Sequence, residues 1–222
     1  TKVSQRQVHP IDCVLSDAEL ATFACSYVTA ENMLNHAQVA AGDTVLVTGA
    51  SGGVGSVSIM LLAGLGYTVA ASTGRLEESD YLKSLGANSV IDRRELSEAG
   101  EMMQAPRWAA AVDSCGSHTL ANVIAQLHYN GAVAACGLAQ GLDLPGNMMP
   151  FALRNVALLG VDSVHAPMAL RERAWQRLAE SVDLNKLEAM AVEIDFDNLP
   201  EAAGQILQGQ IRGRAVVNIA AR

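Results

Sequence analysis

Residues 44–58 read TVLVTGASGGVGSVS, and this stretch decides the fold. Its opening residues, TVLVT, are apolar or β-branched throughout, which is typical of a short strand buried in a parallel sheet. The glycine-rich segment 49–55 follows at once, and a helix is expected directly after it. The stretch therefore predicts a strand, a tight loop and a helix in immediate succession.

The glycine-rich segment matches the G-x-G-x-x-G pattern of dinucleotide-binding loops, with Ala50, Gly52 and Gly55 at its small positions. A small residue at 50 permits the tight turn, Gly52 lets the backbone approach a pyrophosphate, and Gly55 lets the helix pack closely on the strand. The helix N-terminus would offer free N–H groups to the phosphates. The alternative is a strand-to-helix turn without a ligand. A P-loop is excluded because the segment contains no lysine.

Strands and helices alternate along most of the chain. Short apolar runs predict strands at 44–48, 68–72, 89–92, 109–113, 132–136, 156–161, 190–194 and 215–219. Amphipathic or capped segments predict helices at 20–36, 52–66, 77–85, 117–127, 168–182 and 200–208. The predicted fold class is therefore α/β, with a doubly wound parallel sheet of the Rossmann type.

The end of the second predicted strand, ASTGR at 71–75, decides which dinucleotide is favoured. An acidic residue at its tip would bond the ribose 2′-OH of NAD, but the first carboxylate, Glu77, falls in the next predicted helix. The hydroxyls of Ser72 and Thr73 and the guanidinium of Arg75 instead suit a 2′-phosphate, which favours NADPH. The alternative is that Arg75 is a solvated turn residue.

The composition excludes several classes of function. The chain has 222 residues, of which 50% are hydrophobic and 17% charged, and its formal net charge is -8. It is therefore expected to be globular, and its acidity argues against binding nucleic acid or an anionic membrane surface. No apolar run is long enough for a membrane-spanning helix. No secretory signal is visible, and four scattered cysteines favour a reducing, cytoplasmic location.

Motifs along the whole chain give a specific resemblance to a known family. They are GDTVLVTGASGGVGS at 42–56, YLKSLGA at 81–87, VAACGLA at 133–139, MPFALRNVALLGVDS at 149–163 and GQIRGRAVV at 209–217. With these motifs the chain resembles the medium-chain dehydrogenase/reductase superfamily. Within it, the chain is similar to the zinc-independent branch of acrylyl-CoA reductases and quinone-oxidoreductase-like enzymes.

The resemblance implies an NADPH-dependent oxidoreductase that reduces an activated C=C bond of an enoyl thioester such as acrylyl-CoA. In this family a hydride goes to the β-carbon and a proton to the α-carbon. The residues that the resemblance assigns to the cofactor are Thr29, Ser51, Gly52, Gly53, Val54, Ser72, Thr73, Arg75, Cys136, Gly137, Leu138 and Arg214. Of these, Ser72, Thr73 and Arg75 take the 2′-phosphate, and residues 136–138 line the nicotinamide side. The stretch around Arg154, Asn155, Asp162 and Ser163 is expected near the nicotinamide or the domain cleft.

The main departure from the family is at the N-terminus, where members carry a barrel-like catalytic domain that supplies much of the substrate pocket. The chain is therefore expected to be a truncated enzyme with only remnants of that second domain. The expected parts are a linker helix and catalytic-domain remnant at 1–41, a Rossmann NAD(P)-binding domain at 42–182 and a C-terminal return segment at 183–222. Without that domain, the strands predicted at 190–194 and 215–219 would have exposed edges. An exposed edge favours pairing with a second chain, so a homodimer is expected.

Alternatives of function stay open. One is reduction of a quinone or another enone, or alcohol dehydrogenation, within the same superfamily. A second is a non-catalytic dinucleotide-binding module. No metal site is expected, because the histidines stand apart from the cysteines in the sequence. A nucleophilic Cys115 is not favoured, because no base is evident near it, and Cys136 is expected to pack as a small hydrophobic residue.

Overall fold

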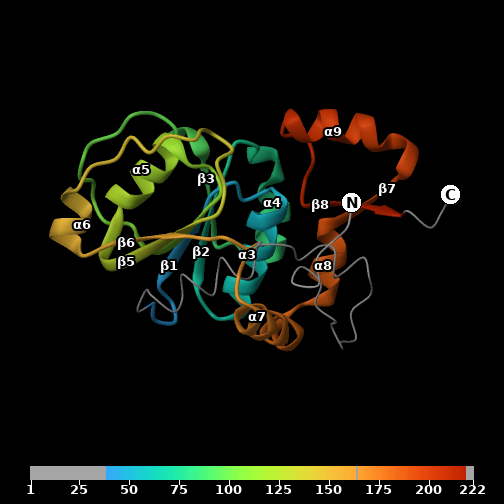
Figure 1. Ribbon diagram of the computed structural model, residues 1–222, viewed down its shortest axis with the longest axis horizontal. Coiled ribbons are helices and arrows are strands. Elements are labelled where there is room, and N and C mark those ends of the chain that lie inside the picture. Colours follow the sequence, from blue (N-terminus) through green and yellow to red (C-terminus); the bar gives the residue numbers. More distant parts are fainter. Residues whose placement is uncertain (1–38, 164, 219–222) are drawn as a thin grey trace.

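The computed structural model describes residues 39–163 and 165–218. At its centre is a six-stranded parallel sheet with the strand order β3-β2-β1-β4-β5-β6 (Figure 1). The strands are β1 (Thr44–Val47), β2 (Thr68–Thr73), β3 (Ser89–Asp92), β4 (Trp108–Asp113), β5 (Leu127–Ala135) and β6 (Ala157–Gly160). This is the strand order of a doubly wound Rossmann sheet, so the predicted fold class is confirmed.

The strand order reverses between β1 and β4, which are neighbours in the sheet although two strands separate them in sequence. Val45 pairs with Ala110 and Val47 pairs with Val112, so the two strands end side by side. Doubly wound sheets bind ligands outside the carboxyl ends of their strands at such a switch point. The glycine loop follows β1 directly and therefore lies at the switch point.

Helices cover both faces of the sheet (Figure 1). One face packs against α3 (Gly53–Gly64), α4 (Ser79–Leu85), α7 (Met168–Ser181) and α8 (Leu184–Met190), and the other packs against α5 (Ser117–Ala125) and α6 (Met149–Arg154). In β1, Val45 and Val47 are buried in the first layer and Leu46 in the second. The alternation of side chains along a strand explains this division, because successive residues point to opposite faces.

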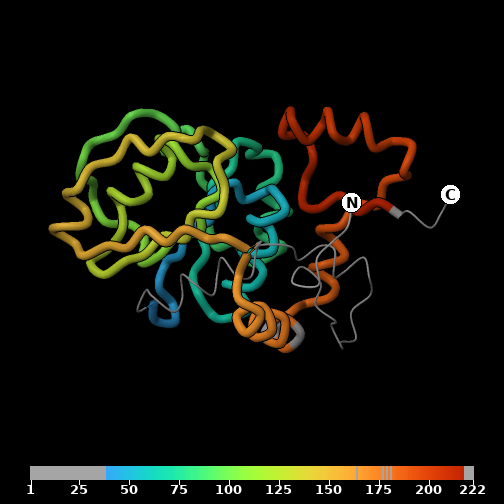
Figure 2. Tube along the Cα trace, in the orientation of Figure 1, coloured from blue at the N-terminus to red at the C-terminus, as the bar shows by residue number. Residues whose placement is uncertain are grey.

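The C-terminal part forms a smaller unit beside the main sheet (Figure 2). Its strands β7 (Ala191–Asp195) and β8 (Arg214–Asn218) pair in parallel and are connected through α9 (Leu199–Leu207). Short 3₁₀ turns lie at η2 (Leu76–Glu78), η3 (Arg93–Glu95) and η4 (Phe196–Asn198). The preceding helix α8 anchors this unit, because Leu187 and Met190 are buried in the core under α3.

Some elements differ from the sequence-based prediction. The helix expected at 117–127 ends at Ala125, and Leu127 already pairs with Trp108 as the first residue of β5. The helices α6 and α8 are absent from the prediction because each is short and carries little periodicity. The start of α8 does have a readable signal, since the Asp183 carboxylate accepts hydrogen bonds from first-turn amides.

The helix expected at 20–36, and with it Thr29, lies outside the described residues. Among the helices of 39–163 and 165–218, none is both long and apolar enough to cross a membrane.

Candidate functional site

The glycine loop turns sharply between β1 and α3. The amide of Gly52 donates to the carbonyl of Gly49 (3.0 Å), and the amide of Ala50 donates to the carbonyl of Ser72 at the end of β2 (3.1 Å). A Cβ atom at Gly55 would collide with the Gly49 carbonyl oxygen and with the backbone of Ala50. Only glycine at this position therefore lets α3 begin so close to the loop.

The start of α3 is open to an anion. Its N-cap residue is Gly52, and no side chain caps the first turn. The first-turn amides of a helix lack intrahelical partners and carry a partial positive charge. The guanidinium of Arg214 lies over Gly53, where a Cβ would be 2.7 Å from the Arg214 Cζ atom. The helix start and Arg214 together form a positively charged surface that suits a pyrophosphate.

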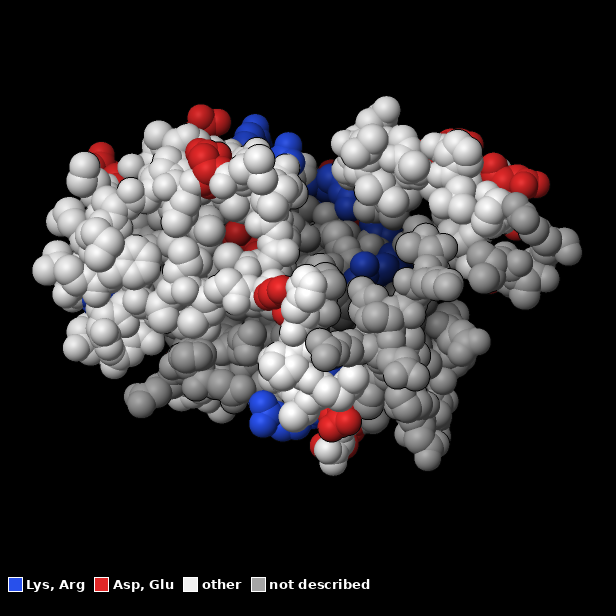
Figure 3. All heavy atoms as spheres, in the orientation of Figure 1, with Lys and Arg blue, Asp and Glu red and all other residues white. Residues whose placement is uncertain are grey.

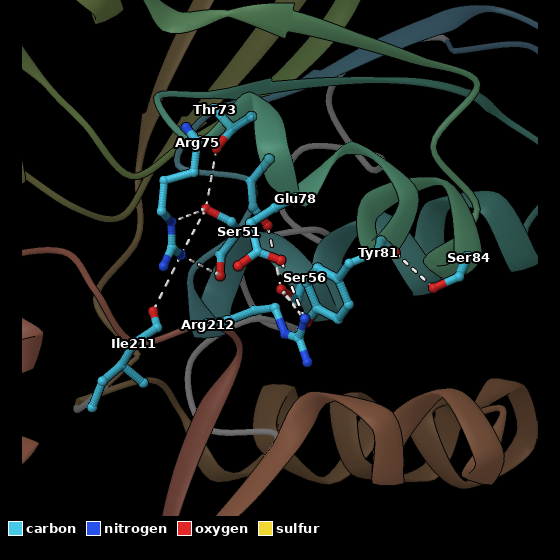
Figure 4. A network of polar contacts seen from close by, with 10 residues as sticks. Ser51, Ser56, Thr73, Arg75, Glu78, Tyr81, Ser84, Ile211 and Arg212 are labelled. Carbon is cyan, nitrogen blue, oxygen red and sulfur yellow. Dashed lines mark hydrogen bonds and ion pairs between the residues drawn. The ribbon is translucent and has the colours of Figure 1, made fainter.

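Arg75 follows β2 and turns back onto the glycine loop (Figure 4). Its Nη2 donates to the Ser51 hydroxyl (2.9 Å) and to the carbonyl of Ile211 (3.2 Å). Thr73 Oγ1 accepts from the Arg75 amide (3.0 Å) and lies 3.1 Å from Ser51 Oγ. The structure thus brings Ser51, Thr73 and Arg75 into one cluster at the tip of β2. Ser72 is buried beneath it.

Arg93 is a candidate that the sequence-based assignment misses. It follows β3 directly, and its side chain covers Gly74, where a Cβ would be 2.6 Å from the Arg93 Nε atom. The carboxylate of the adjacent Asp92 is bonded by Arg94 (Nε to Oδ2, 2.8 Å). The place of Arg93 directly after β3 could have indicated it, because β2 and β3 are parallel neighbours whose carboxyl ends meet at one edge of the sheet.

Arginine side chains converge on this edge although the chain as a whole has a formal net charge of -8. The arginines in contact with the glycine loop, the β2 tip or α4 are Arg75, Arg93, Arg212 and Arg214. Figure 3 shows Lys and Arg atoms in the hollow between the main domain and the C-terminal unit. A local concentration of positive charge in an acidic protein attracts an anionic ligand to that place.

The residues expected on the nicotinamide side follow β5. The Cys136 amide donates to the carbonyl of Asp113 at the end of β4 (2.9 Å), and Gly137 packs against the Ser114 backbone. Leu138 is 60% exposed at the same edge of the sheet. Leu142 is also exposed, next to Gly141, whose carbonyl lies near Gly116 at the start of α5. The exposed Met148, Met149 and Leu153 come later, where the chain approaches the amino end of β6. This half of the edge is therefore apolar where the other half is basic.

Asp113 closes β4 at the switch point. Its Oδ1 accepts from the Thr48 hydroxyl (2.7 Å), and its Oδ2 accepts from the Gly116 amide (2.8 Å). Burial raises the pKa of the Asp113 carboxyl, and these hydrogen bonds oppose the rise. The side chain thus ties the ends of β1 and β4 together.

Two cysteines lie near this carboxyl. Burial is the main cause that raises the pKa of the Cys115 thiol, and the charge of Asp113 raises it further. The thiol therefore stays protonated at neutral pH, which argues against a nucleophilic role. The Cys136 thiol donates to the Asp113 carbonyl (3.4 Å).

Arg154 and Asn155, expected near the nicotinamide or the domain cleft, do not lie at the carboxyl edge of the sheet with residues 136–138. Arg154 donates to the carbonyl of Leu127 (3.1 Å), the first residue of β5. The reason is topological: both residues come just before the parallel strand β6, so they lie at the amino edge of the sheet and not at its carboxyl edge.

Comparison with known families agrees with this architecture. The family described as zinc-binding dehydrogenase matches residues 53–180, more than half of the chain. The chain belongs to this family. It is thus a member of the medium-chain dehydrogenase/reductase superfamily, as the sequence motifs indicate. Despite the family's description, residues 39–163 and 165–218 contain no group of three His, Cys, Asp or Glu side chains that could hold a metal ion.

Relatives of this dehydrogenase-family chain include an acrylyl-CoA reductase, AcuI, from Ruegeria pomeroyi. The two are 49% identical over 176 residues, which are 79% of this chain and 53% of the relative. The chain spans about half the length of the curated relatives it matches.

Solved structures of related oxidoreductases share the fold. The yhdH oxidoreductase from Salmonella enterica, solved in complex with NADP, is 43% identical with a TM-score of 0.88, and the alignment covers 92% of this chain and 64% of the other. The Bacillus subtilis protein yhfP, solved with NAD bound, is 36% identical with a TM-score of 0.85, and the alignment covers 92% of this chain and 64% of the other.

Proposed function

We propose that this chain binds NADPH at the carboxyl edge of β1, β2 and β4, as the cofactor domain of a medium-chain reductase. The observation that carries the proposal is the cluster of Ser51, Thr73 and Arg75 at the tip of β2. It combines a guanidinium and two hydroxyls where a carboxylate would select NAD. The NADP complex of the Salmonella enterica relative supports the same choice of cofactor.

The pyrophosphate site is the start of α3. The amides of Gly53 and Val54, together with Gly52, would receive the phosphate oxygens, since no side chain caps this helix. Arg214 would add a cation from the other side, because its guanidinium already lies over Gly53. Both the helix start and the adjacent Arg214 would therefore contribute positive charge to a bound pyrophosphate.

The 2′-phosphate site is the β2 tip. Arg75 would exchange its hydrogen bonds to Ser51 for charge-assisted bonds to the phosphate, and the freed Ser51 and Thr73 hydroxyls would donate to it. Arg93, across Gly74 from this cluster, would add a second positive charge. The residues 136–138 would face the nicotinamide with backbone groups and an apolar side chain.

The reaction that we propose for the whole protein is reduction of the activated C=C bond of an enoyl thioester such as acrylyl-CoA. A bound NADPH supplies the hydride, and the protein supplies orientation and exclusion of water. The name of the Ruegeria pomeroyi relative, 49% identical over the shared part, favours this substrate over a quinone. The exposed apolar surface that begins at Leu138 is where an acyl chain would find hydrophobic contacts.

A non-catalytic dinucleotide-binding module is the second candidate. It rests on the glycine loop and the cluster of Ser51, Thr73 and Arg75, because these groups suit a dinucleotide without any catalytic side chain. Under either candidate we propose domain limits of 1–41, 42–182 and 183–222, and assembly as a homodimer in the cytoplasm.

The test uses this chain as it stands. NADPH binding is followed by the fluorescence of the reduced nicotinamide, and its oxidation is then followed with acrylyl-CoA and, separately, with a quinone. Binding with enoyl-CoA turnover supports the reductase, and binding without turnover supports the NADPH site without catalysis by this chain alone. Turnover with the quinone alone would show that the substrate is a quinone and not an enoyl thioester. Absence of NADPH binding would contradict the proposal as a whole.

A further inference from the structure

The segment that carries Arg214 is fastened to the main domain by contacts of Ile211, Arg212 and Gly213. Arg212 and Arg214 flank Gly213, whose φ of 60° turns the chain between them. The Gly213 amide donates to the Ser51 carbonyl (2.9 Å), and a Cβ at this glycine would collide with the Met190 carbonyl oxygen. The turn therefore directs the two arginines to different helices.

Arg212 goes to α4 and to the turn before it (Figure 4). Its Cζ lies 4.5 Å from the centroid of the Tyr81 ring, and its Nη1 lies 3.2 Å from Oε2 of Glu78. The Arg212 side chain is 45% exposed and that of Glu78 is 19% exposed, so the ion pair alone contributes little. Stacking on the aromatic face adds a cation–π interaction and fixes the plane of the guanidinium.

Tyr81 also reaches the glycine loop. Its hydroxyl donates to Ser56 Oγ (2.9 Å), and the Ser56 hydroxyl donates to the carbonyl of Ala50 (3.3 Å). Burial raises the pKa of the Tyr81 phenol, so it remains a neutral hydrogen-bond donor. One side chain thus contacts both the support of the glycine loop and the arginine two residues before Arg214.

We propose that Tyr81 and Arg212 form a positioning pair that holds Arg214 over the start of α3. Neither residue contacts the cofactor; the pair acts through Arg214, which meets the pyrophosphate. This inference rests on the proposed function, because it assigns a role within the same NADPH site. It predicts that contacts on α4, one helix away from the glycine loop, control the affinity for both NADPH and NADH.

The test is a double-mutant cycle on Arg212 and Arg214, with NADPH affinity measured by titration and folding by thermal unfolding. Arg212→Gln is expected to weaken NADPH binding about fivefold to tenfold, as expected for loss of one cation–π contact and one exposed ion pair. In the Arg214→Gln background the same change should have no further effect, because the residue through which it acts is gone. NADH affinity should fall by the same factor as NADPH affinity, since the pyrophosphate is common to both.

Conservative variants separate positioning from folding. Arg212→Lys keeps a cation for the ring and for Glu78 and should restore most of the affinity, whereas Tyr81→Leu should lose it and Tyr81→Phe should retain the larger part. Arg173→Gln, an exposed position on α7, is the matched control and should bind NADPH as the wild type does.

The inference is overturned if the effects of the two arginine changes are additive, or if Arg212→Lys is as impaired as Arg212→Gln. It is also overturned if Arg212→Gln binds NADPH normally. The failure of the proposed function looks different, because there the wild-type chain itself would not bind NADPH.

Discussion

Two helix starts lie side by side at the switch point, and only one of them is available to a ligand. α3 follows β1 and α5 follows β4, so both begin at the carboxyl edge of neighbouring strands. At α3 no side chain caps the first turn, and Arg214 lies over Gly53. At α5 the Ser117 amide donates to the carbonyl of Asp143 (3.1 Å) and the Thr119 amide to Oε1 of Gln140 (3.0 Å).

The charges near the two starts also differ. The α5 start holds the buried Asp113, whose carboxylate accepts from the Gly116 amide, while arginines surround the α3 start. An anion is therefore attracted to one start and opposed at the other. The same strand–loop–helix topology thus gives an uncapped, positively charged helix start at one place and a self-capped start beside a carboxylate at the next.

The largest expected effect comes from breaking the α3 start itself. In Gly55→Ala the added methyl group would meet the Gly49 carbonyl and the Ala50 backbone, and such overpacking costs about 1–3 kcal/mol. We expect a lower unfolding midpoint and loss of NADPH binding, measured by calorimetry and titration. The matched control is Gly204→Ala in α9, where nothing lies within 4 Å of the added atom. That variant should be as stable as the wild type or slightly more stable, and an equal loss in both would refute the close-packing explanation.

The second prediction concerns the acidic start of α5. Asp113→Asn keeps one oxygen for two donors, so with the oxygen toward the Gly116 amide the Thr48 hydroxyl loses its acceptor, at a cost of about 1–3 kcal/mol. The variant should still bind one NADPH per chain, because the Ser117 and Thr119 amides at the start of α5 keep their hydrogen bonds to Asp143 and Gln140. Binding of a second NADPH molecule by the variant would contradict the contrast between the two starts.

The pH dependence of this stability difference has a definite sign. Because burial raises the folded-state pKa of Asp113 above its unfolded value of about 3.9, the folded state binds more protons above that pH. The stability that the Asp113 carboxyl adds to the folded state is therefore fully present below about pH 4, and it is lost as the pH rises through the raised pKa. The unfolding midpoints of the wild type and Asp113→Asn should accordingly approach each other from acidic to alkaline pH. A gap that widens with pH would contradict the raised pKa.

A smaller effect is expected at the β2 tip from Arg93. Arg93→Gln should weaken NADPH about threefold and NADH hardly at all, because an exposed charge contributes little to a phosphate contact. The adjacent Arg94→Gln is the control, since Arg94 is held by Asp92 and should leave both affinities unchanged. Equal losses of NADPH affinity in the two variants would contradict the assignment of Arg93 to the 2′-phosphate site.

The smallest effect is expected at Cys115, on the apolar half of the edge. Its raised pKa predicts that iodoacetamide modifies it more slowly than an unfolded cysteine at pH 8. Cys115→Ser should change NADPH affinity by no more than about twofold. Rapid modification that also blocks NADPH binding would give this thiol a role that its surroundings do not indicate.

Local patterns predict the first half of this site and tertiary packing decides the rest. β1 and the glycine loop are consecutive in sequence, and Arg75 comes two residues after the end of β2, so both features can be read from local sequence. Arg93 and Arg212 reach their places only because β3 lies beside β2 and because Gly213 turns the chain toward α4. The self-capping of α5 depends on Gln140, which bonds an amide 21 positions earlier in the chain.

The most direct measurement is a paired calorimetric titration of NADPH and NADH into the wild-type chain and into Arg75→Ala. A charged hydrogen bond contributes about 1.5–3 kcal/mol, so the wild type should prefer NADPH by about tenfold or more. Arg75→Ala should lose most of this preference and keep no more than the roughly threefold part that we assign to Arg93. A wild-type chain that binds both equally, or a variant that keeps the preference, would contradict the assignment of the 2′-phosphate to the β2 tip.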